Sequence, residues 1–292
     1  MKSLIGLSVL SALLLSGCAT GPRPAHVVLV GLDGLGARYL DGRVKTPNLD
    51  RLKREGAWTM KSRSVLPSSS AVNWASLFMA AGPEQHGYVK WNSQEPVLQP
   101  DVVLPSGRFP DVFALLRATR PEAEIGYFYQ WGGMGFVADT NAVSCVCPTL
   151  SKTADEAIAY LKDRRPEFLA IVLDSPDGAG HSKGFGGPEY AQETERLDGV
   201  VGNVVQAVCE AGMADDTVII VTSDHGGLNK SHGGTTPEEM CRPLVFWGKG
   251  VRPNRELASA TAIYDVGSTL LYLLGVEQPQ VCIGRPIVEA FD

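Results

Sequence analysis

The sequence predicts an α/β fold with a mostly parallel central sheet and helices on both faces. Short apolar runs that are typical of buried strands alternate along the chain with segments of helical periodicity. Three of these runs end in acidic or histidine residues, as expected for a site at the carboxyl edge of a parallel sheet. The 292 residues suit one large domain behind a short leader.

The chain begins with the pattern of an export signal. Lys2 precedes an apolar run over 5–15, and Leu-Ser-Gly stands directly before Cys18. The run is too short to span a bilayer, which takes ~20 apolar residues, and small residues before a cleavage point are typical of secretory signals. The motif resembles the bacterial lipobox, in which the cysteine is acylated and becomes the N-terminus. We expect a signal peptide over 1–17 and a lipidated tether over 18–25; an ordinary signal peptide is the alternative.

The residue after Cys18 indicates where the anchored protein is sorted. In lipoproteins that this motif resembles, an Asp at that position retains the protein in the inner membrane, whereas here Ala19 follows. We therefore expect a lipid anchor in a bacterial membrane, the outer membrane facing the periplasm. The downstream sequence contains no second run that is long and apolar enough to span a bilayer, so the body is expected to be soluble and tethered.

Composition and charge are those of a globular protein. Hydrophobic residues make up 44% of the chain and charged residues 20%, and the net charge of −6 argues against a nucleic-acid partner. An oxidising compartment permits disulfides. The five cysteines after Cys18 are an odd number, so at least one is expected to be free or paired outside the chain; they are Cys145, Cys147, Cys209, Cys241 and Cys282.

The elements are expected in a strand–helix alternation. An apolar run over 26–32 predicts the first strand, and Thr46 as cap with Pro47 in the first turn predicts a helix through residue 56. Further strands are expected over 125–129, 168–173, 217–221 and 244–247, and further helices over 70–81, 111–118, 154–161, 188–211 and 265–274. Residues 26–292 are expected to form one domain. Its weakly periodic stretches 87–111 and 132–150 are expected to form a small loop-rich cap within 87–150.

Acidic and histidine side chains follow three of the predicted strands. Asp33 follows the first strand, Asp177 and His181 follow the strand over 168–173, and Asp224-His225 follows the strand over 217–221, with His232 close behind. Three of the five histidines of the chain fall in the last two clusters. Carboxylate and imidazole together suit zinc and similar divalent ions. The sequence therefore predicts a metal site at this edge of the sheet.

These motifs together resemble the alkaline phosphatase superfamily, and within it the type I phosphodiesterase/nucleotide pyrophosphatase branch. The resemblance spans most of the mature chain and includes Thr46-Pro47-Asn48-Leu49, the segment from Asn73 to Gly87 and the segment from Tyr264 to Gly275. It implies two zinc ions, one held by Asp177, His181 and His232 and the other by Asp33, Asp224 and His225 together with a nucleophilic hydroxyl. In many relatives the histidine that corresponds to His232 lies much farther downstream, but no histidine follows it here.

The resemblance places the nucleophile at the start of the helix after Pro67. Counting back from Pro83-Glu84-Gln85-His86-Gly87 leads to Ser70, and the neighbouring Ser68 and Ser69 stay open as alternatives. Relatives also hold a phosphoryl oxygen with an Asn amide, for which Asn92 is the candidate, although Trp91 occupies the usual position.

The function that the resemblance implies is hydrolysis of phosphodiester or pyrophosphate bonds of a small-molecule substrate through a phosphoserine intermediate. The alternatives are a phosphomonoesterase or phosphoryl transferase of the same superfamily, which would use a cation such as Arg63, Lys90 or Lys183, and a non-catalytic binding lipoprotein. Sulfatase activity is not expected, because the sequence around Ser70 lacks the Pro and Arg that formylglycine conversion needs.

Overall fold

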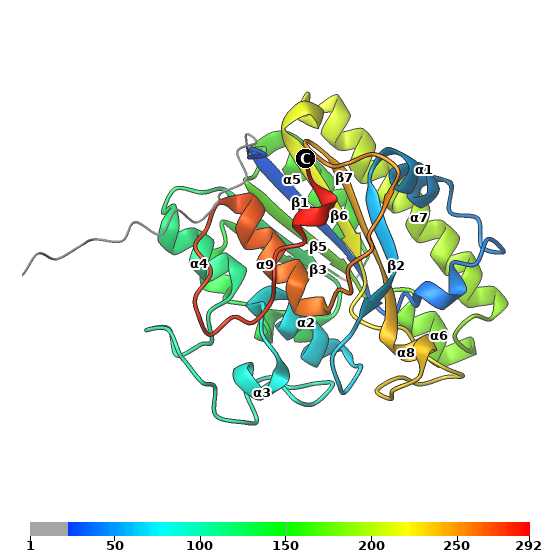
Figure 1. The fold of residues 1–292 in the computed structure, drawn as a ribbon, viewed down its shortest axis with the longest axis horizontal. Helices are drawn as coiled ribbons and strands as arrows, with labels where there is room; N and C mark the ends of the chain where they lie inside the picture. Colours follow the sequence, from blue (N-terminus) through cyan, green and yellow to red (C-terminus); the bar gives the residue numbers. More distant parts are fainter. Residues whose placement is uncertain (1–22, 150) are drawn as a thin grey trace, which may run out of the picture.

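The computed structural model of the protein describes residues 23–149 and 151–292. The predicted signal peptide and Cys18 lie outside the described residues. One eight-stranded sheet forms the centre of the molecule, in the order β4-β3-β5-β1-β6-β7-β2-β8 (Figure 1). The strands are β1 His26–Leu32, β2 Ala57–Arg63, β3 Ile125–Tyr129, β4 Cys145–Pro148, β5 Phe168–Leu173, β6 Thr217–Thr222, β7 Cys241–Gly248 and β8 Arg255–Glu256.

The sheet is mostly parallel, as predicted. The central strand β1 pairs in parallel with β5 on one side and β6 on the other, and β3 continues the parallel pairing from β5 to β4. Only β7, among the described strands, runs antiparallel to both of its neighbours, β6 and β2. The carboxyl ends of β1, β5 and β6 therefore meet at one edge of the sheet, where ligands of open α/β sheets bind.

Helices cover both faces of the sheet (Figure 1). One face packs against α2 Ser70–Met79, α4 Val112–Thr119 and α9 Ile263–Leu274. The other face packs against α1 Pro47–Glu55, α5 Thr153–Arg164 and α7 Pro188–Glu210. Shorter helical segments are α3 Pro83–His86, α6 Asp177–Lys183, α8 Pro237–Met240 and the 3-10 turns Ala37–Tyr39, Gly132–Phe136, Thr140–Ala142, Ala214–Asp216 and Val288–Ala290. This two-sided burial explains why β1, β5 and β6 are apolar along nearly their whole length.

Several elements differ from the sequence prediction. The strands β2, β4 and β8 were not predicted, because none of them is a continuous apolar run. Thr46 does precede α1, but its side chain makes no capping hydrogen bond. Asp198 of α7 supplies the cap instead, and its carboxylate accepts from the backbone N–H groups of Asn48 and Leu49 at 3.0 and 2.8 Å.

The loop-rich stretches contact one another beside the sheet. The hydroxyl of Tyr88 donates to the carbonyl of Phe136 at 2.7 Å, and a guanidinium nitrogen of Arg108 donates to the same carbonyl at 3.0 Å. Residues 145–148 leave this region to form the edge strand β4. Within the described part of the chain all five cysteines are free thiols, and no helix there is long and apolar enough to cross a membrane.

Candidate active site

Six acidic and histidine side chains converge at the carboxyl edge of the sheet. Their ligand atoms form two groups, in each of which every atom lies within 4.8 Å of the others. The first group combines Asp33, Asp224 and His225, and the second combines Asp177, His181 and His232. These are the two sets that the sequence predicted. They come from the ends of β1, β5 and β6, from α6, and from the loop that follows β6.

The first group is completely enclosed by the fold. Asp33 is 4% exposed, and Asp224 and His225 are 0% exposed. The Nε2 atom of His225 lies 3.2 Å from Asp224 Oδ2 and 3.6 Å from Asp33 Oδ1. Burying two carboxylates side by side without a cation is costly. No basic side chain forms an ion pair with Asp33 or Asp224 among the described residues, apart from the imidazole of His225.

Ser70 is the hydroxyl that faces the first group. Its Oγ atom lies 3.1 Å from His225 Nε2 and 3.4 Å from Asp33 Oδ1, at the first residue of α2. The neighbouring serines have other surroundings. Ser68 Oγ bonds to the backbone of Gly233 and Gly234, and the buried Ser69 Oγ has no hydrogen-bond partner. The geometry therefore favours Ser70 over both alternatives as the nucleophile.

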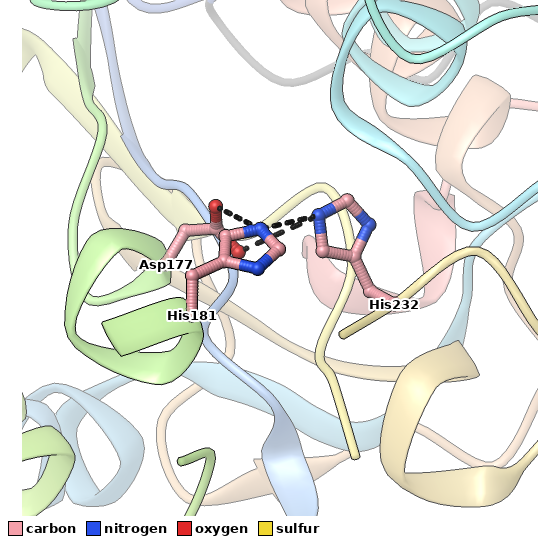
Figure 2. Close-up of side chains that lie close together, drawn as sticks. All are labelled: Asp177, His181 and His232. Atoms are coloured by element: carbon pink, nitrogen blue, oxygen red, sulfur yellow. Dashed lines mark hydrogen bonds and ion pairs between the residues drawn. The ribbon is translucent and has the colours of Figure 1, made fainter. Parts of the chain in front are cut away.

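The second group joins α6 to the loop after β6 (Figure 2). Asp177 and His181 are one turn apart on α6, and Asp177 Oδ2 lies 3.2 Å from His181 Nε2. His232 reaches in from the loop and places its Nε2 3.1 Å from His181 Nε2 and 3.7 Å from Asp177 Oδ1 (Figure 2). Its ring also stacks on His225, with centroids 3.8 Å apart, so the two groups are adjacent.

The hydrogen bonds around the histidines leave lone pairs that face one another. Each Nδ1 atom lies against a backbone carbonyl, which can only accept a proton: Lys230 for His181, Gly226 for His225 and Ser68 for His232. The Nε2 atoms of the neutral rings are then unprotonated acceptors. Two such acceptors 3.1 Å apart cannot bond to each other. Buried Asp177 Oδ1 and Asp224 Oδ2 also lack a hydrogen-bond partner. These carboxylate oxygens and imidazole nitrogens fit divalent cations as ligands. A histidine that binds a metal through Nε2 usually donates its Nδ1–H to a carbonyl, as these three histidines do.

Burial sets the protonation of the site when only protein groups are present. It raises the pKa of Asp33 and of Asp177 above the usual range for Asp, with neighbouring carboxylates adding to the effect, and it raises the pKa of Asp224 to about 7. Burial also lowers the pKa of His225, and together with the charge of His225 it lowers the pKa of His232 to about 3. A bound cation would lower the pKa values of these carboxylates and keep them ionised, because metal ligands must be deprotonated.

Two residues that the sequence did not single out support Asp33. Trp74 of α2 donates its indole N–H to Asp33 Oδ2 at 2.9 Å. The indole fits because Gly31 has no side chain; a Cβ atom there would lie 2.4 Å from the ring. The buried hydroxyl of Tyr190 donates to the carbonyl of Gly34 and accepts from the N–H of Gly36, which holds the turn after Asp33. No local sequence pattern indicates these contacts, because they depend on tertiary packing.

A pocket of about 530 Å³ opens beside the second group. Its lining includes both histidines of that group together with Pro67, Ser69, Lys90, Trp91, Asn92, Ser231 and Gly233. Asn92 is thus placed at the site, and the exposed indole of Trp91 stands at its wall. Of the three candidate cations, Lys90 lines the pocket, whereas Arg63 donates to the sulfur of Cys241 and Lys183 lies exposed on α6.

The fold and the paired acidic–histidine groups define the chain as an α/β protein with two candidate metal-binding groups at the carboxyl edge of its sheet. Residues 27–105 and 131–235 match the profile of the family described as type I phosphodiesterase / nucleotide pyrophosphatase. The match covers more than half of the chain and contains all six ligand candidates, Ser70 and Asn92. The protein belongs to this family.

Individual relatives agree with this assignment. The human ectonucleotide pyrophosphatase/phosphodiesterase family member 1 is 26% identical over an alignment of 230 residues that covers 72% of this chain and 24% of that protein. The chain therefore spans about a quarter of the length of this relative. Among solved structures, murine ectonucleotide pyrophosphatase/phosphodiesterase 5 in complex with AMP has a TM-score of 0.73 at 15% identity, covering 87% of this chain and 96% of that one. A variant of the alkaline phosphatase PafA has a TM-score of 0.76 at 12% identity, covering 94% and 100%.

Proposed function

We propose that this protein hydrolyses phosphate esters at phosphodiester or pyrophosphate bonds, using two zinc ions and Ser70 as the nucleophile. The observation that carries the proposal is the position of the Ser70 hydroxyl, 3.1 Å from His225 Nε2 and beside two groups of metal-ligand type. Family membership and the names of the relatives support the phosphodiester bond as the target.

The first chemical step forms a bond between Ser70 Oγ and phosphorus and releases the leaving group as an alcohol or phosphate. Ser70 is the first residue of α2, where the helix end favours a negatively charged phosphoryl group. His225 Nε2 and Asp33 would be occupied as ligands, so the Ser70 proton would be lost to solvent water, which a divalent ion next to the hydroxyl would favour. Two bound divalent ions would supply positive charge for the alkoxide, the phosphoryl oxygens and the leaving oxygen. Water then hydrolyses the phosphoserine and regenerates the hydroxyl.

The side chains around the nucleophile hold it in place for this reaction. Trp74 fixes Asp33, and the carbonyl of Trp91 accepts the N–H of Ala71 at 3.1 Å, which ties the pocket loop to the first turn of α2. This contact brings Asn92 to the pocket, where its amide is proposed to bind a phosphoryl oxygen. Most of the rate enhancement would come from such placement and charge stabilisation.

A paired assay with metal analysis tests the proposal. Protein lacking residues 1–18 should contain about two zinc ions per chain and should cleave bis-p-nitrophenyl phosphate faster than p-nitrophenyl phosphate. Bound metal without turnover of either ester would favour the non-catalytic binding protein. Absence of bound metal after purification and reconstitution with zinc would contradict the proposed site.

The nucleophile is tested by substitution. Ser70→Ala should abolish turnover of both esters while the protein keeps its metal, because the hydroxyl attacks phosphorus but contributes only one of several ligands. Phosphate transfer from substrate should label the wild-type protein at Ser70 under acid quench. If Ser69→Ala is inactive and Ser70→Ala is active, the nucleophile is Ser69.

Lys90 favours phosphomonoesters as a second class of substrate. A Lys in the wall of the pocket can offset the additional negative charge of a monoester dianion. In that case p-nitrophenyl phosphate is the better substrate, and Lys90→Ala lowers its kcat/KM more than that of the diester. Equal effects on both esters would count against this second function.

We further propose that Cys18 carries the lipid anchor and that the protein faces the periplasm from the outer membrane. The proposal is supported by the Leu-Ser-Gly sequence before Cys18 and by Ala19 after it. Labelled palmitate should be incorporated into the full chain and not into Cys18→Ala. Recovery of the unmodified chain in the soluble fraction would contradict the anchor.

A further inference from the structure

Ser68, which lies two residues before the nucleophile, is tied to the loop that carries His232. The residue is fully buried. Its carbonyl lies 3.0 Å from His232 Nδ1, and its hydroxyl accepts from Gly233 N at 3.1 Å and donates to Gly234 O at 2.7 Å. One serine thus makes three contacts with three consecutive residues of the other segment.

These contacts determine which nitrogen of His232 faces the second ligand group. Because the carbonyl of Ser68 can only accept, the proton of the neutral ring is held on Nδ1 and the lone pair of Nε2 points toward His181 and Asp177. The two hydroxyl contacts fix the backbone directly after His232. Gly233 has a φ of +113°, so this turn is a conformation that must be held by specific contacts.

The imidazole of His232 also stacks on His225, and Gly234 N donates to Glu239 Oε1 at 2.8 Å, but neither contact selects which ring nitrogen faces the second group. The residues that precede His232 are held by backbone contacts between Leu228 and Ser231 and between Asn229 and Phe185, and the carbonyl of Lys230 faces His181. Those contacts anchor the loop to α6. Only Ser68 connects the His232–Gly234 stretch to the segment that leads into α2, among the hydrogen bonds of the described residues.

We propose that Ser68 is a positioning residue for His232 and controls the metal affinity of the Asp177–His181–His232 group. The inference rests on the proposed function, since it requires a metal at that group. It assigns no chemical step to Ser68. Removing the hydroxyl would leave Gly233 N and Gly234 O unpaired, which is costly in a buried setting, and would free the loop to move His232 away from its partners. The Asp33–Asp224–His225 group has no contact with the Ser68 hydroxyl and should keep its metal.

The test is a zinc titration of the full chain as the cell makes it, against a chromophoric chelator, for wild type and Ser68→Ala. Loss of a supporting contact typically weakens metal affinity about 10- to 100-fold. Ser68→Ala keeps the carbonyl that faces His232 Nδ1 and loses only the two loop contacts, so one of the two sites should bind zinc about 10-fold more weakly, the lower end of that range, and the other should be unchanged. In a His232→Ala background, adding Ser68→Ala should cause no further loss of affinity at either site.

Ser144→Ala is the matched control. The Ser144 hydroxyl also bridges a backbone N–H and a backbone carbonyl, those of Ile125 and Ala123, but it lies at the amino ends of β3 and β4, away from the site. Ser144 differs from Ser68 in being exposed and in also accepting from Arg117 at 3.0 Å, and its removal should leave both zinc affinities at the wild-type values. If wild type binds two ions and Ser68→Ala binds both as tightly as Ser144→Ala does, the role of Ser68 is refuted and the proposed function stands. If wild type itself binds no zinc, the proposed function is refuted, and this inference with it.

Discussion

Each imidazole of the site is oriented by a backbone carbonyl, whereas the remaining buried histidine, His86, is oriented by a serine and an amide. His86 Nδ1 accepts from Tyr88 N at 3.1 Å, and its Nε2 lies 2.9 Å from Ser76 Oγ, whose own proton goes to Val72 O. The ring is therefore neutral and protonated on Nε2. A second proton on Nδ1 would point at the N–H of Tyr88, so the charged form has no partner.

This arrangement predicts how stability depends on pH. Burial lowers the pKa of His86 from 6.5 to about 3 in the folded protein. Between these pH values the unfolded chain binds a proton that the folded chain does not. The contribution of neutral His86 to the free energy of unfolding is therefore complete above pH 6.5 and is lost as the pH falls toward 3. Relative to His86→Gln, the wild-type free energy of unfolding should fall by about 1.4 kcal/mol per pH unit below pH 6. Urea denaturation of both proteins in chelator measures this; parallel pH profiles would contradict it.

At the scale of elements, α1 depends on a cap that comes from another helix. Asp198 Oδ1 accepts from Leu49 N at 2.8 Å, and Oδ2 accepts from Asn48 N and Nδ2 at 3.0 and 2.9 Å. The carboxylate also places negative charge at the positive end of α1. The close approach of the two helices requires Gly202, because a Cβ atom there would lie 2.6 Å from the Asn48 side chain.

Asp198→Ala should therefore lower the free energy of unfolding by at least about 2 kcal/mol, since a single bond to a charged acceptor is worth about 1.5–3 kcal/mol and the N–H group of the buried Leu49 would be left unpaired. Asp198→Asn should fall between this variant and wild type, because it keeps one acceptor oxygen. Thr46→Ala should change stability by less than about 0.5 kcal/mol, since its hydroxyl makes no cap bond. Chemical denaturation ranks the three variants, and a larger loss for Thr46→Ala would contradict the assignment.

Most of the elements could be predicted from the sequence, and the exceptions share a physical cause. The strands β1, β3 and β5 have the predicted bounds because both of their faces are buried and their sequences are apolar throughout. The strand β2 is half exposed at Met60, Lys61 and Arg63, so its composition does not distinguish it from a loop. The helix α6 contains Gly178 and Gly180, which disfavour helix, so the sequence did not predict it.

The residues of the site also divide into those that the sequence could predict and those that depend on tertiary packing. Asp33, Asp224 and His225 could be predicted from the fold class, because residues directly after parallel strands meet at one edge of the sheet. Asp177, His181 and His232 lie farther past the strand ends, and their grouping was implied by the resemblance to the family. The sequence predicted Ser70 with Ser68 and Ser69 as alternatives, and in the structure only the Ser70 hydroxyl faces the first ligand group. Trp74, Tyr190 and the supporting carbonyls could not be predicted, because each acts across a long sequence separation through tertiary packing.

At the scale of the whole molecule, metal removal should destabilise the fold. The two groups bring together three buried or nearly buried carboxylates, whose pKa values burial raises, at the point where β1, β5 and β6 end. A cation that binds only the folded state stabilises it by about 2.7 kcal/mol at a free concentration 100 times its Kd. For a chain of this size each kcal/mol shifts Tm by about 2–4 °C.

Chelation should therefore lower the Tm of the wild-type protein by about 5 °C or more, and zinc should restore it. The matched control is the double variant Asp33→Asn with Asp177→Asn, which lacks one carboxylate ligand of each group. Its Tm should not respond to chelator or zinc. A wild-type Tm that is equally insensitive would argue against metal binding. Differential scanning calorimetry measures all of these values.

Gly31 in β1 leaves room for the indole of Trp74, which in turn donates a hydrogen bond to Asp33 of the site. Because the indole of Trp74 fills the volume where a side chain at position 31 would stand, the two positions can change only together. Enlarging residue 31 would push the indole off Asp33, and shrinking residue 74 would leave that carboxylate without its hydrogen bond. Any redesign of this strand must treat the pair as one unit, so a residue without a side chain restricts the choice of sequence as strictly as a ligand does.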